Sequence, residues 1–194
     1  MSLGLKRKTV KLEPHDAAWE ISAQQVIHTL KGILQEDARD IQHIGSTSIK
    51  TIMAKPIVDI AVGVEKLEDM RKHDRQLEKG GFLFRGEDVK GQLLYVLGDT
   101  ANDIRTHHIH VVLWGREDWR HYLLFRDYLN CHEEEAGAYS SLKKALCEKY
   151  PNDRGSYTQN KQTMIDEILI NAERWEKENE KTPFARQRPK QTDF

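Results

Sequence analysis

The residues from Ile57 to Val64 constrain the fold more than any other segment, because they combine a run of β-branched residues with one carboxylate. Such a run favours a β-strand, in which side chains alternate between two faces. One face is then continuously apolar and consists of Val58, Ile60, Val62 and Val64. Asp59 lies on the other face, where burial is costly unless the carboxylate is paired, hydrogen-bonded or bound to a metal. Asp59 is therefore either a metal-binding or catalytic residue, or a structural one satisfied by backbone donors or a lysine.

The same alternation predicts a strand from Ile104 to Trp114. It places His108 and His110 on one face and His107 on the opposite, apolar face. Two imidazoles at this spacing lie within roughly 7 Å of each other and can bind one metal ion or one phosphate. The alternative is a pair of polar side chains on a solvated sheet face. His107 is predicted to be a hydrogen-bonded core histidine.

A Gly-Ser segment, Gly45-Ser46-Thr47-Ser48, follows a short strand predicted at residues 40–44. Backbone N–H groups and hydroxyls in such a turn can bind phosphate. Glycine and serine are also ordinary loop residues, so the segment alone does not establish a site. Twelve residues separate Ser46 from Asp59. We therefore expect the turn and the carboxylate to meet across neighbouring strands.

The remaining pattern predicts helices around this strand region. Amphipathic or charged helices are expected at residues 16–36, with Asp16 as N-cap, and at 66–79. Two more strands are expected at 82–85 and 92–97. From 116 to 180 the pattern is helical, with breaks near His132 and at 151–153. The fold class is therefore α/β (α+β), with a mixed sheet of about five strands flanked by helices and a C-terminal helical layer.

Length and charge limit the classes of partner. The 194 residues predict one domain at 10–180, between an N-terminal extension at 1–9 and a polar tail at 181–194. The net charge of −1 gives no global field that favours nucleic acid or an anionic membrane as a partner. No apolar run approaches the roughly 20 residues of a membrane span, so we expect a soluble cytoplasmic protein. Cys131 and Cys147 lack metal or redox spacing and are expected to be reduced.

Two blocks of the sequence resemble the signature of the GrpB family: His43–Ser48 followed by Ala54–Ile60, and Arg105–Val112. Phe125–Leu129 and two Tyr-x-x-x-Lys units, which begin at Tyr139 and Tyr157, resemble the helical part of that family. The resemblance runs from about Val10 to Ala172 and covers most of the chain.

The GrpB family is similar to nucleotidyltransferases, in which a Gly-Ser turn and an acidic-x-acidic strand hold a divalent metal against a nucleoside triphosphate. The resemblance implies a nucleotidyltransferase-like sheet, with Gly45 and Ser46 in the phosphate turn and Asp59 as a metal ligand. Ala61 stands where the second acidic residue belongs, which removes an anionic oxygen that two-metal chemistry needs. His108 and His110 are expected to supply replacement ligands for Mg²⁺, Mn²⁺ or Zn²⁺, and histidine suits the last two better.

Basic residues of the predicted helices are expected to complete an anion site. We assign nucleotide or phosphate binding to Gly45, Ser46, Thr47, Ser48, Lys55, Arg126, Lys143, Tyr157 and Lys161. In each Tyr-x-x-x-Lys unit the two side chains share a helical face, which also fits a packed tyrosine beside a solvated lysine. Arg126 has the alternative of an ion pair within its helix.

Two functions remain open at this point. The first is metal-dependent nucleotidyl transfer to an unknown acceptor, with Asp59, His108 and His110 as catalytic residues and metal ligands. The second is a binding module that recognises a nucleotide, a phosphorylated small molecule or a coenzyme-A-like phosphate without turnover.

Overall fold

The computed structural model describes residues 3–87 and 89–180. The predicted polar tail at 181–194 lies outside the described residues, as do the first two residues of the expected N-terminal extension.

Six strands form one mixed sheet in the order β2-β3-β6-β5-β4, and β1 also pairs with β6. The strands are β1 Leu5–Lys6, β2 Ala38–Ile44, β3 Val58–Val64, β4 Leu83–Phe84, β5 Leu93–Asp99 and β6 Ile104–Leu113. Within residues 3–87 and 89–180, β3 and β6 are the one parallel pair, and the other strand pairs are antiparallel. The sheet confirms the predicted fold class. The sixth strand, β1, was not predicted because two residues are too few to show alternation.

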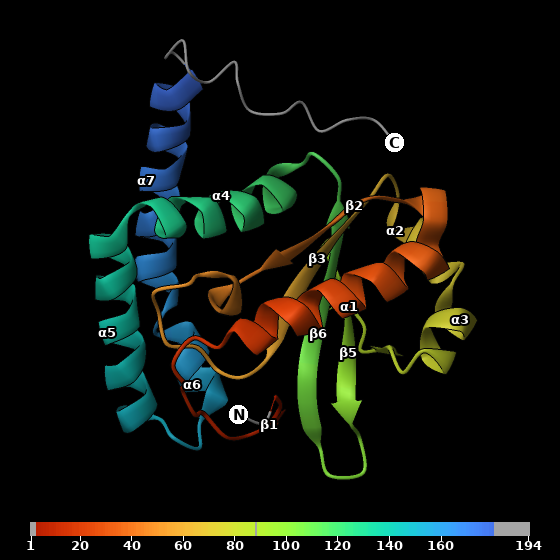
Figure 1. Cartoon of the computed structure of the whole chain (residues 1–194), viewed down its shortest axis with the longest axis horizontal. Helices are drawn as coiled ribbons and strands as arrows, with labels where there is room; N and C mark the ends of the chain where they lie inside the picture. The colour runs from red at the N-terminus through yellow and green to blue at the C-terminus, as the bar shows by residue number, and fades with distance from the viewer. Residues whose placement is uncertain (1–2, 88, 181–194) are drawn as a thin grey trace.

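Three helices pack on one face of this sheet (Figure 1). They are α1 Ala17–Leu34, α2 Leu67–Arg71 and α3 Asp74–Lys79. The Asp16 carboxylate accepts a hydrogen bond from the N–H of Ala18, which confirms the predicted N-cap. The single helix expected at 66–79 is wrong, since it breaks at His73, whose Nε2 lies 2.7 Å from an Asp37 carboxylate oxygen.

The apolar face of β3 lies in the core beneath α1, as its alternation predicts. The cluster joins one side of α1 to the inner faces of β3 and β6, and includes Trp19, Ile27, Leu30, Val58, Ile60, Val62, Ile109 and Val111. The opposite face of the sheet is covered by α4 Glu117–Cys131, whose Trp119 packs against Ala61 and Val112. Both faces of the central strands are therefore buried.

The C-terminal helices form a layer of their own beside the sheet (Figure 1). They are α4, α5 Glu133–Lys149, α6 Arg154–Gln159 and α7 Gln162–Glu180. Their breaks fall near His132 and after Tyr150, where they were expected, and one further break at Asn160 and Lys161 was not predicted. Ile49 and Ile52, from the loop between β2 and β3, are buried against this layer.

The two cysteines are free, with Cys131 at the end of α4 and Cys147 on α5. Among the described residues, none of the helices combines the length and the apolar character that a bilayer span requires.

His107 offers a test of the strand register. It is 5% exposed, and its ring nitrogens lie 3.0 Å from the Ser22 hydroxyl on α1 and 2.9 Å from the Thr106 hydroxyl. We expect His107→Ala to lower the free energy of unfolding by roughly 1–3 kcal/mol, because it leaves buried partners unsatisfied. Urea unfolding measures this loss. A change below about 0.5 kcal/mol would be typical of a surface position and would contradict the packing described.

Candidate metal and anion site

The parallel pairing of β3 with β6 brings together the three side chains that the sequence singled out. In this register Asp59 lies beside His108, and Ala61 lies beside His110. The side chains of Asp59, His108 and His110 all project from the face opposite α1. His110 therefore stands next to the position where the second acidic residue is missing.

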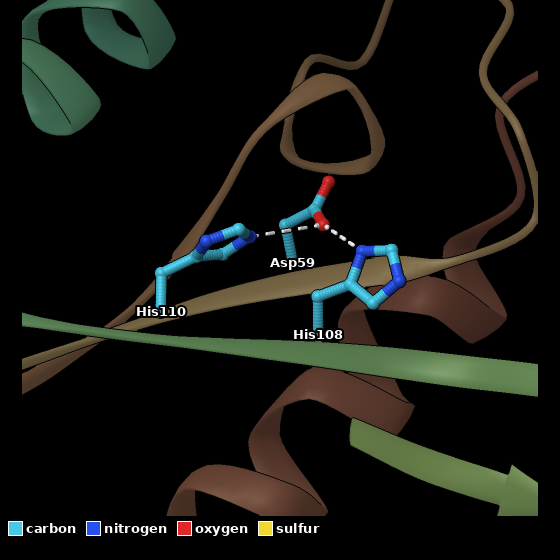
Figure 2. A group of neighbouring side chains, drawn as sticks. All are labelled: Asp59, His108 and His110. Carbon is cyan, nitrogen blue, oxygen red and sulfur yellow. Dashed lines mark hydrogen bonds and ion pairs between the residues drawn. The ribbon is translucent and has the colours of Figure 1, made fainter. Parts of the chain in front are cut away.

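Asp59, His108 and His110 converge on one point (Figure 2). One carboxylate oxygen of Asp59 lies 3.1 Å from His108 Nδ1 and 3.5 Å from His110 Nε2. One potential ligand atom from each residue lies within 4.8 Å of the others. The side chain of His108 is only 10% exposed, so it does not lie on a solvated sheet face.

Electrostatics favour an ionised carboxylate at this point. Burial opposes ionisation of Asp59, but hydrogen bonds from His108 and His110 outweigh burial and hold the pKa of the carboxyl well below its usual range. Burial lowers the pKa of the His108 imidazole, although Asp59 opposes this effect. The cluster thus offers one anionic oxygen and imidazole nitrogens, which is a mixed donor set that borderline transition metals accept. The residues therefore fit Mn²⁺ or Zn²⁺ better than Mg²⁺.

Gly45 closes the site on the side of the turn. Its φ is +69°, a conformation that favours glycine, and a Cβ built there would lie 2.6 Å from an Asp59 carboxylate oxygen. The residues that follow, Ser46–Ser48, form one 3₁₀ turn. The absence of a side chain at Gly45 thus lets the turn lie directly against the carboxylate.

Two residues of the turn use their hydroxyls internally. Thr47 is hydrogen-bonded to His43 Nε2 at 2.9 Å, and the Ser48 hydroxyl donates to the carbonyl of Gly45 at 2.6 Å. Asn130 of α4 donates to the carbonyl of Ser48 and ties the turn to the helical layer. Among the four residues assigned to phosphate binding here, Ser46 is the one that lines the cavity described next.

A small cavity of about 90 Å³ joins the turn, the strand cluster and the helical layer. It is lined by Ser46, Lys55, Ile57, Asp59, His108, Lys143, Arg154, Tyr157 and Lys161. The structure therefore brings Lys55, Lys143, Tyr157 and Lys161 to the same place as Asp59 and Ser46. Both Tyr-x-x-x-Lys units contribute to this cavity, although Lys161 lies beyond the end of α6.

Arg126 lies elsewhere. Its guanidinium donates to Gln42 Oε1 and to the carbonyl of His43, both at 3.0 Å, and pairs with Asp127 at 2.7 Å. It borders a larger groove of about 760 Å³ between α1, β2 and α4. The structure thus gives Arg126 a role in fastening α4 to β2 and does not bring it into the small cavity.

Arg154 is the cavity residue that the sequence analysis missed. Its Nη2 lies 3.4 Å from His108 Nε2, and its guanidinium lines the cavity. Asp153 caps α6 by accepting from the N–H of Ser156, which places Arg154 in the first turn. The available signal was its position three residues before Tyr157, a spacing that puts both on one helical face.

The position of the second acidic residue is closed. Ala61 is fully buried in an apolar cluster with Ile44, Val112 and Trp119. Tyr122 of α4 packs against His110, with ring centres 5.5 Å apart, and its hydroxyl donates to Gln92 Oε1 at 2.7 Å. Trp119 and Tyr122 of α4 thus pack over the position where the second acidic residue would stand.

The fold and this placement of the turn beside the strand cluster define a class of protein. A crystal structure of the Cid1 poly(U) polymerase with MgGTP bound matches with a TM-score of 0.50 over 71% of this chain and 44% of that one. The sequence identity is 14%, so the likeness shows a shared nucleotidyltransferase-type fold alone.

The chain belongs to the GrpB family, since the model of that family, described as GrpB protein, matches residues 9–171. The glutamate-rich protein GrpB of Alkalihalophilus pseudofirmus is 41% identical over 86% of this chain and 98% of its own length. The crystal structure of the conserved protein GrpB from Enterococcus faecalis matches with a TM-score of 0.75 and 29% identity, over 83% of this chain and 98% of that one. A dephospho-CoA kinase of Mycolicibacterium paratuberculosis is 23% identical over 88% of this chain. The match covers 48% of the length of that kinase.

Gly45 gives a test of the site geometry. We expect Gly45→Ala to weaken divalent-metal binding, because the new Cβ displaces the Asp59 carboxylate, and to cost roughly 1–3 kcal/mol of stability through the left-handed backbone. Calorimetric titration with Mn²⁺ and urea unfolding measure the two effects. Gly137→Ala on α5 is the matched control, since nothing lies within 4 Å of its added Cβ. Unchanged Mn²⁺ affinity in Gly45→Ala would show that the turn does not hold the carboxylate in place.

Proposed function

We propose that this GrpB protein binds a nucleotide or another phosphorylated ligand together with one divalent metal ion, and that it catalyses nucleotidyl transfer. The observation that supports this most is the single cavity that Ser46, Asp59, His108 and three lysines line together. Two of the three proposed metal ligands, Asp59 and His108, open on the same space as a group of cations, which is what a metal-bound phosphate ligand requires.

Each part of the cavity has a role in this proposal. Asp59, His108 and His110 would hold the metal ion, whose charge would offset that of the phosphate oxygens. Ser46 and the Gly45 turn would orient one phosphate group. Lys143 and Lys161 would place further positive charge beside it. Asp59, His108, His110 and Lys143 lie on strands and on a helix, so little reorganisation of these residues is needed when the ligand binds.

A second function is supported by a different observation. Ala61 and its apolar cluster leave a single carboxylate at the site, whereas two-metal phosphoryl transfer needs several anionic oxygens. A relative is named dephospho-CoA kinase, which makes a coenzyme-A-related ligand a specific candidate. In this alternative the domain recognises the phosphate and does not turn it over.

Asp59 tests the proposal directly. We expect Asp59→Ala to abolish the dependence of nucleotide affinity on Mn²⁺, because it removes the only carboxylate among the three metal ligands. The fold is expected to survive, since the Asp59 side chain is 28% exposed and the apolar packing of β3 and β6 beneath α1 does not involve it. Nucleotide affinity is measured by calorimetry with and without Mn²⁺ in both proteins.

The control for this experiment is Glu167→Ala, which removes an exposed carboxylate on α7. A Mn²⁺ effect that persists in Asp59→Ala would exclude Asp59 from the ligand set. A Mn²⁺ effect without release of pyrophosphate from any nucleoside triphosphate would favour the binding module over the transferase.

A further inference from the structure

Lys143 is the most unusual residue of the cavity. It comes from the middle of α5, is 1% exposed, and its ammonium group donates to the carbonyl of Met53. A buried ammonium is costly unless it is paired, and one carbonyl is a weak partner for three donors. The charges that act on Lys143 are those of Lys161 and Lys55, and both are positive. Among the described residues, Asp59 is the one carboxylate that lines the cavity, and it is paired with His108 and His110, not with one of the three lysines.

The three lysines are held in place by aromatic rings. Lys143 Nζ lies 4.7 Å from the ring centre of Tyr139, while Lys55 and Lys161 lie 5.1 and 5.0 Å from that of Tyr157. Cation–π contacts at these distances position an ammonium group and leave its charge uncompensated. The rings thus position the ammonium groups, as a carboxylate could, but they do not neutralise the positive charge. We call the part of the cavity lined by Lys55, Lys143, Lys161 and Arg154 the lysine pocket.

Burial and neighbouring positive charges disfavour the protonated form of two lysines in the lysine pocket. Burial lowers the pKa of Lys143 to about 6, and burial together with Arg154 and Lys161 lowers the pKa of Lys55 to about 7. Asp59 acts on Lys55 in the opposite direction. An incoming anion restores the favourable environment for both ammonium groups, so anion binding and protonation of the pocket support each other.

The size of the cavity limits what enters it. About 90 Å³ is far below the roughly 300–1,000 Å³ of sites that enclose drug-sized ligands. A nucleoside does not fit such a space, whereas a single tetrahedral oxyanion does. The larger groove beside β2, of about 760 Å³, shares no lining residues with this cavity.

We propose that the lysine pocket binds the terminal phosphate group of the ligand without a metal ion, and that the sugar and base lie outside it. This inference rests on the proposed function and names its ligand class: molecules that end in a phosphate group, selected by that group and not by the base. Free phosphate, a phosphomonoester and the end of an oligophosphate chain share this chemistry.

The experiment measures binding of inorganic phosphate, pyrophosphate, ATP and adenosine by calorimetry and thermal melting, in EDTA and without added metal. We expect the three phosphates to bind and adenosine not to bind. At about 100 times its dissociation constant, phosphate is expected to raise the melting temperature by roughly 5–10 °C. ATP and pyrophosphate of similar affinity would show that the base is not read, and a strong preference for ATP would overturn that part of the inference.

The matched variants are Lys143→Met and Lys144→Met, which replace a buried and an exposed lysine of the same helix. We expect Lys143→Met to weaken phosphate binding by at least about tenfold, since it removes a charged hydrogen-bond donor, and Lys144→Met to leave it unchanged. Lys161→Met repeats the test in the partly exposed connection between α6 and α7, where we expect the substitution to have little effect on the stability of the fold. Equal affinity in all three variants would overturn the inference.

The pH dependence of the melting temperature of the anion-free protein distinguishes an anion-binding lysine from a merely structural one. Because the pKa of Lys143 is lowered from 10.5 to about 6 on folding, the unfolded chain binds more protons between these values, and stability rises with pH. Without anion, Lys143→Met is therefore expected to melt above the native protein at pH 7, by a margin that narrows towards pH 10. A lower melting temperature for this variant at pH 7 would mean that Lys143 stabilises the fold, and the pocket would not be an anion site.

Asp59→Asn separates this inference from the proposed function. Phosphate binding in EDTA is expected to persist in Asp59→Asn, because the variant removes a negative charge beside the incoming phosphate and leaves the three lysines in place. Loss of phosphate binding in this variant, or binding of phosphate only with Mn²⁺, would overturn the inference and leave the metal-dependent function standing. Phosphate binding without any Mn²⁺ effect on nucleotide affinity would support the inference and contradict the metal-dependent function.

Discussion

The parallel hydrogen bonding between β3 and β6 is the interaction on which the rest of the site depends. It sets Asp59 beside His108 and Ala61 beside His110, so that two imidazoles reach one carboxylate from the neighbouring strand. A shift by one residue would turn all of them towards α1. The valines and isoleucines on the other face prevent this shift, because they fill the core under that helix. The same apolar packing that makes the sheet stable therefore positions the polar cluster.

Much of this arrangement followed from sequence alternation alone. The faces of β3 and β6, the burial of His107 and the grouping of Asp59 with two histidines are local consequences of a period of two. Alternation along the strands does not predict where the helical layer packs. Arg154 and the true surroundings of Arg126 depend on how α4 and α6 pack against the sheet, and that packing is decided by contacts far apart in the chain. The break of the helix at His73 likewise depends on Asp37, which lies 36 residues earlier.

Composition was misleading in one respect. A net charge of −1 predicts no global preference for anions. The cations of the small cavity are nevertheless concentrated, because folding draws one lysine from the loop after the Gly-Ser turn and others from α5 and from the connection after α6. Overall neutrality therefore says little about a local field, and a buried lysine such as Lys143 is invisible to any count of charges.

The two halves of the cavity have different mechanical support. The cluster of Asp59, His108 and His110 belongs to the two central strands, which are hydrogen-bonded on both sides. Tyr157 and Arg154 belong to α6, a helix of six residues whose order depends on its neighbours. Elements of this kind open at lower free energy than the centre of a sheet. A ligand that contacts both halves would bridge regions of unequal rigidity, and its residence time would be governed by the opening of α6 and not by the strands.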